Sequence, residues 1–166
     1  MQKPMTNELR VKIKQYIKNN LDISDLIRDV CIRGEDLSHA IIKDASRPDD
    51  DITGCRLFQA TIGDENKITN FNRLTAQNCN FQGVNFLGKI WLRYADMKGS
   101  NFKGAKMIGL DYKFCDFSGC DFCNAVICIG SDRGTGAKFD EKFFKDLTEN
   151  WQIEVRLKNK EKKNGK

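Results

Sequence analysis

Four cysteines in the second half of the chain have a spacing that could bind an iron–sulfur cluster. They are Cys115, Cys120, Cys123 and Cys128, in the pattern C-x4-C-x2-C followed by one further cysteine. Thiolates at similar spacings hold [2Fe–2S] clusters of the plant type. The sole histidine, His39, stands outside any constellation of Cys, Ser and acidic residues that would suggest catalysis. No Gly-rich phosphate loop of the Walker or Rossmann type occurs in the sequence.

A five-residue repeat surrounds these cysteines and changes their interpretation. It runs from about residue 30 to residue 129, and each unit has a large apolar residue, here called the centre, two positions after a small or apolar one. Only Arg47 among the nineteen centres is polar. A repeat of fixed period decides the architecture and favours a solenoid. The centres are Ile32, Leu37, Ile42, Arg47, Ile52, Leu57, Ile62, Phe71, Ala76, Phe81, Phe86, Trp91, Met97, Phe102, Met107, Tyr112, Phe117, Phe122 and Ile127.

A period of five excludes a regular helix and fits a chain that turns a corner once per unit. Strand residues alternate between the two faces, so two residues of each unit can point inward and three outward. Four sides would close a coil of about twenty residues, and successive coils would stack about 4.8 Å apart. Glycines that follow the centres, such as Gly83, Gly99 and Gly119, suit such corners. The sequence therefore predicts an all-β solenoid.

The repeat separates the four cysteines of the cluster-like motif. Cys115 and Cys120 take inward positions on adjacent sides, whereas Cys123 and Cys128 follow centres and point outward. Four thiolates placed in this way could not converge on one cluster, so we expect no metal and no cofactor. Buried free cysteines act as small hydrophobic residues and indicate a reducing compartment. Since no apolar run has membrane length and no signal peptide is evident, we expect a cytoplasmic protein without membrane contact.

The units resemble those of the pentapeptide-repeat family, which read roughly Ala-Asp/Asn-Leu/Phe-x-x. Ala95-Asp96-Met97 and Cys120-Asp121-Phe122 are examples. The resemblance implies a right-handed quadrilateral β-helix. It covers about residues 30–129, is strong over residues 79–127 and is weaker over residues 30–62. Membership of this family implies a fold and does not by itself determine a function.

Three features interrupt the repeat. Residues 63–68 are polar and begin with glycine, which predicts a loop that leaves the coil. The step from Trp91 to Met97 is one residue too long, which predicts a bulge at residues 92–94. Both sites can be harmless insertions or can carry partner contacts. Positions that should face inward are polar at Glu35, Arg47, Asp50 and Lys89.

Helices are expected at both ends of the solenoid. Residues 7–19 form an amphipathic pattern with Thr6 as its N-cap, and residues 138–151 show aromatic residues at helical spacing. Helices there would cap the open core and the unpaired edge, but the C-terminal aromatic face could instead form a homodimer contact. That face comprises Phe139, Phe143, Phe144, Leu147 and Trp151. The predicted segments are an N-terminal cap (1–29), the β-helix (30–129), a C-terminal cap (130–157) and a lysine-rich disordered tail (158–166).

Stacking the units by side predicts two stripes on the outer surface. A basic stripe contains Arg73, Arg93 and Lys113. An apolar ladder contains Leu87, Ile108 and Ile129. Exposed apolar ladders usually have a cover, here either the C-terminal segment of the chain or a partner protein. A basic stripe can be a solvated face or can bind an anionic partner.

Three functions follow from these features. We prefer a non-enzymatic scaffold that binds a partner protein, because a solenoid offers surfaces and no catalytic constellation is evident. The family resemblance suggests an alternative, since its best-known members protect or inhibit DNA gyrase by imitating duplex DNA. Mimicry needs a dense negative surface, whereas residues 33–134 carry thirteen acidic and thirteen basic residues. Binding of nucleic acid through the basic stripe is the third function, and it would depend steeply on salt.

Overall fold

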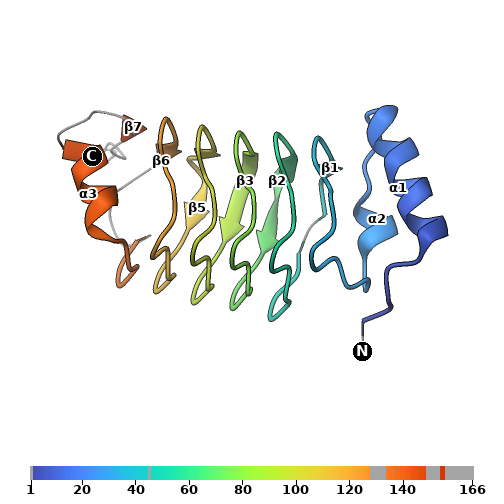
Figure 1. The fold of residues 1–166 in the computed structure, drawn as a ribbon, viewed down its shortest axis with the longest axis horizontal. Coiled ribbons are helices and arrows are strands. Elements are labelled where there is room, and N and C mark those ends of the chain that lie inside the picture. The colour runs from blue at the N-terminus through green and yellow to red at the C-terminus, as the bar shows by residue number, and fades with distance from the viewer. Residues whose placement is uncertain (1, 45, 128–133, 149–153, 156–166) are drawn as a thin grey trace, which may run out of the picture.

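The chain winds into parallel coils that stack along one axis, with helices at both ends. Figure 1 shows this arrangement in the computed structural model, which describes residues 2–44, 46–127, 134–148 and 154–155. The helices are α1 (Asn7–Lys18), α2 (Ser24–Ile27) and α3 (Glu141–Thr148). The strands are β1 (Ile41–Ile42), β2 (Thr61–Asn70), β3 (Asn85–Trp91), β4 (Lys106–Met107), β5 (Leu110–Asp111), β6 (Val126–Ile127) and β7 (Glu154–Val155).

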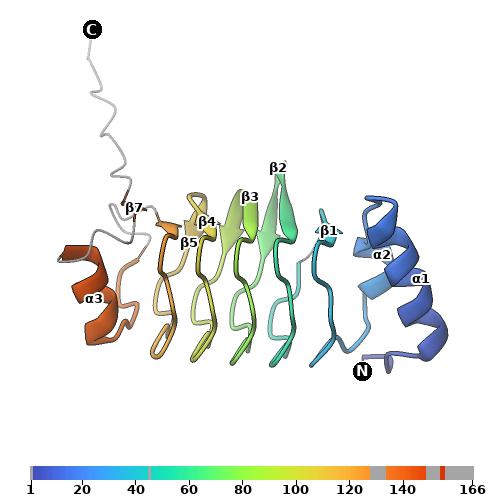
Figure 2. The same ribbon diagram turned by 45° about the horizontal axis from the view of Figure 1, so that its top comes forward.

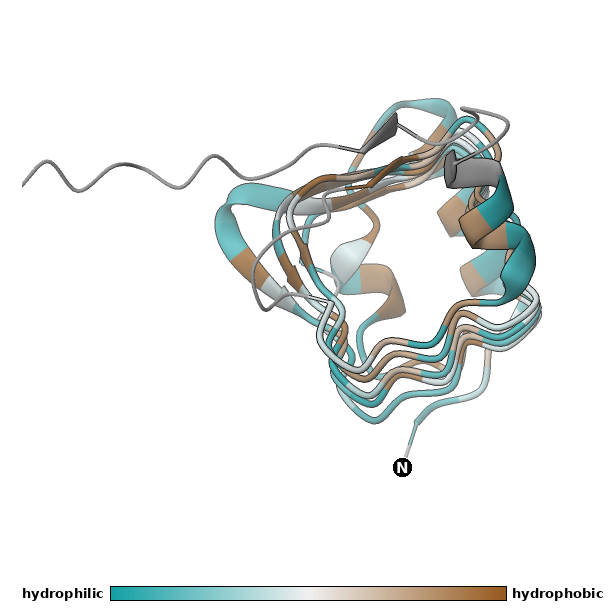
Figure 3. Ribbon diagram, turned by 90° about the vertical axis from the view of Figure 1, so that its left-hand side faces the viewer, coloured by the Kyte–Doolittle hydropathy of each residue, from teal (hydrophilic) through white to brown (hydrophobic). Residues whose placement is uncertain are grey.

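Parallel pairing between successive coils builds a four-sided tube, which Figure 3 shows end-on. Partners on one side are 20 residues apart from Asp36 to Arg56, 24 from Arg56 to Asn80, 21 from Asn80 to Asn101 and 20 from Asn101 to Asp121. The turn of about twenty residues confirms the predicted quadrilateral β-helix. The two longer turns contain the two interruptions of the repeat.

Each side of the tube, here called a wall, lines the core with a column of buried centres. The stretch that one coil contributes to a wall is called a rung. The columns are Ile42, Ile62, Phe86, Met107 and Ile127 on wall 1, Phe71, Leu92 and Tyr112 on wall 2, Ile52, Ala76, Met97 and Phe117 on wall 3, and Leu37, Leu57, Phe81, Phe102 and Phe122 on wall 4. All of these side chains are buried.

The extra residue of the second interruption lies before Trp91, so the predicted bulge at residues 92–94 is wrong. Ile90 and Leu92 are buried, at 0% and 1% exposure, whereas Trp91 between them faces outward and is half-buried. Leu92 is therefore the centre. The additional residue lies between Phe86 and Ile90, within β3, where the phase of the repeat shifts. The five-residue period alone could not show that Trp91 is buried, because its neighbours Ile90 and Leu92 are also large and apolar.

The first interruption is a loop within β2, as predicted. β2 pairs with β3 through Gly63 and Leu87 and again through Ile68 and Lys89. Residues 64–67 therefore leave the wall, and β2 rises above its neighbours in Figure 2. Beside this loop three glycines stack in successive coils. A Cβ atom would come within 2.4 Å of the Leu87 carbonyl oxygen at Gly63, 2.1 Å of the Asp64 oxygen at Gly88 and 1.9 Å of the Gly88 oxygen at Gly109.

Replacing Gly109 by alanine should lower the free energy of unfolding by about 3 kcal/mol, because a rung must move to admit the methyl group. Gly104→Ala is the matched control. Gly104 has φ +68° but nothing within 4 Å of its Cβ position, so only backbone strain of about 1 kcal/mol is expected. Urea denaturation followed by circular dichroism measures both values. Equal losses for the two variants would contradict the role of close packing at Gly109.

Helices close both ends of the core. Thr6 caps α1 through a hydrogen bond from the Leu9 amide, and Ile13 of α1 is buried. At the other end Phe143 of α3 is 3% exposed and packs against Phe122, with ring centroids 5.2 Å apart. Both predicted helices are therefore present. None of the helices in the described residues has the length and hydrophobicity needed to span a membrane.

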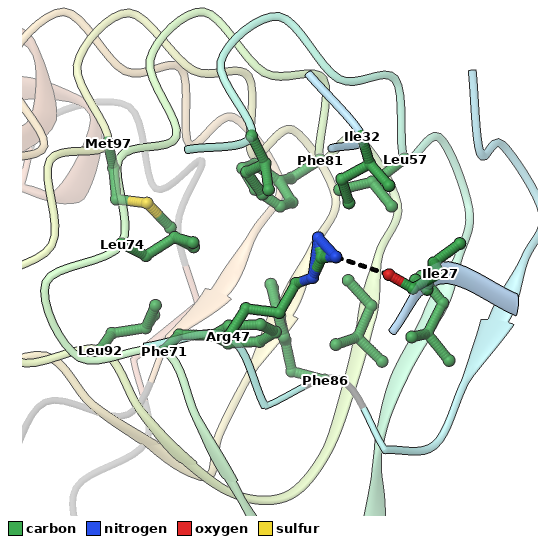
Figure 4. Close-up of a pocket in the computed structure, with 13 residues that line it drawn as sticks. Ile27, Ile32, Arg47, Leu57, Phe71, Leu74, Phe81, Phe86, Leu92 and Met97 are labelled. Atoms are coloured by element: carbon green, nitrogen blue, oxygen red, sulfur yellow. Dashed lines mark hydrogen bonds between the residues drawn. The ribbon is translucent and has the colours of Figure 1, made fainter. Parts of the chain in front are cut away.

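The polar centre, Arg47, lies inside the tube and fastens the N-terminal cap to it. Its side chain is 9% exposed and lines a cavity of about 30 Å³ among apolar residues (Figure 4). The guanidinium donates hydrogen bonds to the carbonyl oxygens of Ile27 (2.6 Å) and Val30 (2.7 Å). It also forms an ion pair with Asp50 at 2.8 Å, whose side chain is 7% exposed. The rung continues through Arg47 and Asp49, whose amides bond to the next coil.

Thiols and one hydroxyl at the small inward positions bond to the coil before them. Each donates to a backbone carbonyl oxygen, and each is buried. The pairs are Cys55 to Ile32 (2.6 Å), Cys79 to Ile52 (3.0 Å), Ser100 to Ala76 (2.6 Å), Cys115 to Leu92 (2.5 Å) and Cys120 to Met97 (3.0 Å). Burial raises the pKa of these thiols, to about 11 for Cys79 and about 12 for the other three. They remain protonated donors within the core.

Candidate functional site

The residues of the predicted basic stripe lie on the outer face of wall 2. Because Leu92 is the centre of its rung, Arg93 and Lys113 share a column with Asn72, while Arg73 lies in the next column, at the corner. The single stripe that the sequence suggested is thus two columns. Three successive rungs carry twelve outward residues here, which we call the basic–aromatic face. They are Ile68, Asn70, Asn72 and Arg73, then Lys89, Trp91, Arg93 and Tyr94, then Gly109, Asp111, Lys113 and Phe114.

Two stacked aromatic rings form the corner of this face. Tyr94 and Phe114 are 61% and 48% exposed, and their ring centroids are 4.9 Å apart at an angle of 9°. The Phe114 ring also lies against Gly136, where a Cβ atom would come within 2.5 Å of it. The ring faces that Tyr94 and Phe114 turn toward each other are therefore covered, while both side chains remain well exposed.

Both rings stand on strained backbone, with φ +60° at Tyr94 and +57° at Phe114. This left-handed conformation costs roughly 1–2 kcal/mol for a residue with a bulky side chain. Stacking contributes about 0.5–1.5 kcal/mol, so the pair brings the fold no clear gain. Most other left-handed corners hold glycine or asparagine, which tolerate the conformation. These are Gly34, Gly54, Asn78, Gly83, Gly99, Gly104, Gly119, Asn124 and Gly136.

Arginines flank the aromatic corner and form ion pairs along the wall. Arg73, 68% exposed, pairs with Asp49 in the preceding coil, and this hydrogen-bonded contact raises the pKa of Arg73 and lowers that of Asp49. Arg93 pairs with Asp111 at 2.6 Å and lies 5.6 Å from the ring centroid of Trp91. Nε and Nη2 of Arg93 both donate hydrogen bonds to the same oxygen of Asp111, Oδ2. Its Oδ1 is buried and lacks a hydrogen-bond partner.

The basic–aromatic face combines positive charge with exposed aromatic rings. Four of its twelve residues are cationic and one, Asp111, is acidic. Sequence analysis found the cations Arg73, Arg93 and Lys113 but missed the aromatic pair, since it assigned Tyr94 to a bulge. The signal was present, because an aromatic residue stood where most other corners carry glycine or asparagine and where His39, Asp49, Gln59 and Arg73 are polar exceptions.

The apolar ladder is present in part on wall 1. Leu87 is half-buried and Ile108 is 40% exposed, and their rungs are adjacent. Ile129 lies outside the described residues. Leu87 also lines a hollow of about 230 Å³ with Lys43, Gly63 and the β2 loop. The β2 loop therefore lies beside Leu87, a neighbour that the sequence did not suggest.

The C-terminal aromatic face divides into a buried and an exposed part. The rings of Phe139 and Phe143 stack on each other with centroids 4.0 Å apart, and Phe139 stacks on Phe117 at 5.2 Å. These two rings pack against the end of the core of their own chain. Phe144 is 54% exposed. The side chain of Leu147 and the whole of Trp151 lie outside what the structure describes.

The residues that suggested chemistry are kept apart. Cys115 and Cys120 are buried and Cys123 is half-buried, while Cys128 lies outside the described residues. His39 is exposed at a left-handed corner and meets only the edge of Phe58 among aromatic rings, at 5.4 Å. Within the described part of the chain, no group of three or more His, Cys, Asp or Glu residues could hold a metal ion.

Comparisons with known proteins agree with the repeat. A family model described as pentapeptide repeats (8 copies) matches residues 92–122, and no curated protein matches the chain. A pentapeptide-repeat protein, Rfr23, from the cyanobacterium Cyanothece 51142 is 13% identical, with a TM-score of 0.22 and coverage of 73% of this chain. This chain spans only 64% of the length of that structure.

QnrB1, a plasmid-mediated fluoroquinolone resistance protein, is also similar. Its trypsin-treated R167E form is 15% identical, with a TM-score of 0.19, and the match covers 75% of this chain and 91% of that one. The full-length form is 14% identical, with a TM-score of 0.18 and coverage of 74% and 92%. These scores are too low to support inferences about function. The match of the family model shows that residues 92–122 consist of pentapeptide repeats, and the structure places them in a four-walled parallel coil.

Proposed function

We propose that the protein is a non-enzymatic scaffold that binds a partner protein through the basic–aromatic face. The observation that carries this proposal is the exposed pair Tyr94–Phe114, held on strained backbone at a corner where glycine or asparagine would serve the fold better. Strain of this kind at an exposed position is typical of functional sites. Exposed aromatic and arginine side chains are also the residue types that dominate binding energy at protein interfaces.

Imitation of duplex DNA is less well supported. A mimic needs a continuous negative surface, whereas carboxylates on walls 3 and 4 are paired with cations of the same or neighbouring coils. Examples are Arg56–Asp36 at 3.2 Å, Arg33–Asp51 at 3.3 Å and Lys98–Asp116 at 3.5 Å. We expect no inhibition of gyrase supercoiling by the purified chain, and inhibition would favour mimicry. A cytoplasmic location suits a scaffold whose buried thiols are unpaired in the core.

Affinity capture with the immobilised chain tests the scaffold. The double variant Tyr94→Asn, Phe114→Asn should lose the captured partner, whereas its stability should change by no more than about 1 kcal/mol, because relief of strain offsets lost stacking. The matched control is His39→Asn, Gln59→Asn, which alters two left-handed corners of another wall. That control should retain the partner. Full capture by the Tyr94, Phe114 variant would contradict the proposal.

The apolar ladder provides a second arm of the same experiment. Leu87→Asp and Ile108→Asp place carboxylates on wall 1, away from the basic–aromatic face. If wall 2 alone binds the partner, both variants should capture it as the native chain does. Loss of capture in these variants, with retention in the Tyr94, Phe114 variant, would move the docking surface to wall 1.

A further inference from the structure

We infer that the occupant of the basic–aromatic face is an acidic peptide segment of a partner protein, with apolar residues next to its carboxylates. The inference rests on the proposed function and adds the chemistry of the partner. Lys89, Arg93 and Lys113 lie on the wall and Arg73 at its corner, against two carboxylates, Asp111 on the face and Asp49 in the preceding coil. Charge complementarity therefore favours an anionic partner.

The aromatic corner favours the same chemistry. Tyr94 and Phe114 stack on each other, so the two ring faces that meet are closed to a partner, and the pair offers ring edges and the outer face of Tyr94. The edge of an aromatic ring carries positive partial charge, which attracts carboxylate and carbonyl oxygens. Apolar side chains can pack against the same edges and against exposed Ile68, 48% exposed at the other margin of the face.

Single-stranded nucleic acid, the other anionic polymer, fits less well. Its sequence-independent binding relies on bases that stack on free aromatic faces. Tyr94 covers one face of Phe114, Gly136 lies beside the Phe114 ring, and Arg93 lies over the Trp91 ring. A base that entered between the Tyr94 and Phe114 rings would have to separate rungs that are hydrogen-bonded to each other through Tyr94 and Lys113.

The size of the face sets the length of the segment. Three rungs spaced about 4.8 Å apart extend over roughly 10 Å, which an extended chain crosses in about three or four residues. Carboxylates of the segment would compete with Asp49 for Arg73, whose ion pair is exposed and therefore weak. A short motif with two or three acidic residues beside an apolar one matches this surface.

A random dodecapeptide library displayed on phage tests the inference with the full-length chain as bait. We expect the enriched peptides to carry Asp or Glu within three or four residues of an apolar residue. A synthetic copy of the best peptide should bind the Tyr94→Asn, Phe114→Asn variant and the Arg73→Gln, Lys113→Gln variant about tenfold more weakly, as measured by isothermal titration calorimetry. It should bind the His39→Asn, Gln59→Asn control as it binds the native chain, and more weakly in 300 mM than in 50 mM salt.

Several outcomes would overturn the inference. They are enrichment of neutral or basic peptides, equal binding to the Tyr94, Phe114 variant, no enrichment at all, or tighter binding of oligo-dT than of any peptide. Failure here is distinguishable from failure of the scaffold. If affinity capture still depends on Tyr94 and Phe114 while the display experiment fails, the scaffold stands and only the acidic chemistry is wrong. If the Tyr94→Asn, Phe114→Asn variant captures the partner as well as the native chain does, the proposed function itself fails.

Discussion

Replacing Arg47 by alanine should lower the free energy of unfolding by about 3–5 kcal/mol, the usual cost of breaking a buried ion pair. The variant leaves the Asp50 carboxylate, 7% exposed, without its cation. It also removes the donors to the Ile27 and Val30 carbonyl oxygens at the end of α2. The cavity beside the guanidinium would grow in addition. The N-terminal cap should therefore detach more readily from the first coil.

Urea denaturation and hydrogen exchange of α1 measure this effect. Arg56→Ala is the matched control, because Arg56 is 61% exposed and pairs with Asp36 on the surface, and it should cost no more than about 1 kcal/mol. The double variant Arg47→Met, Asp50→Ala removes both buried charges and should recover most of the loss. An Arg47→Ala variant as stable as Arg56→Ala would show that the pair does not hold the cap.

The sequence predicted the architecture because the five-residue period has a single physical solution. Two inward residues per unit and a corner after each centre predict a coil, the resemblance to pentapeptide repeats implies four walls, and the bridge pattern shows them. The phase of the repeat across β3 could not be predicted in the same way. Ile90, Trp91 and Leu92 are all large and apolar, so hydrophobicity alone could not decide which of them faces inward. Pairing with Leu110 and Asp111 of the next coil decides it.

The polar exceptions of the N-terminal half have a tertiary explanation that no local pattern contains. Glu35 forms an ion pair with Arg10 of α1 at 2.5 Å, and this hydrogen-bonded contact lowers the pKa of Glu35. Arg47 and Asp50 pair with each other and hold α2. The repeat is irregular in this region because these residues join a helical cap to the coil.

The candidate site was predictable only in its charges. Arg73, Arg93 and Lys113 could be assigned to one side by counting, although the one-residue shift in phase divides them between two columns. The aromatic corner required the backbone, because only φ +60° and +57° show that Tyr94 and Phe114 occupy positions suited to glycine. In this fold, candidate functional residues are therefore bulky side chains at corners whose positive φ favours glycine or asparagine.

Alkaline pH should unfold the protein through its buried thiols. Cys55, Cys79, Cys115 and Cys120 have pKa values raised by burial to about 12, 11, 12 and 12, from a reference value of 9.0. The unfolded chain therefore releases these protons first. Stability is fully present below pH 9 and falls as the pH rises toward 11 for Cys79 and 12 for the others. At pH 10 the titration of each thiol lowers the free energy of unfolding by about 1.4 kcal/mol, and the four thiols together lower it by about 5 kcal/mol.

A loss of that size approaches the whole stability of an ordinary domain, so the urea midpoint should fall sharply between pH 8 and pH 10 in the presence of a reductant. The control replaces all four cysteines by serine, a substitution that Ser100 models at the same kind of position, where its hydroxyl bonds to Ala76. Hydroxyls do not titrate in this range, so the variant should lose about 5 kcal/mol less over the same interval, whatever its stability at pH 8. An identical pH dependence in the two proteins would mean that other groups, and not the core thiols, control alkaline unfolding.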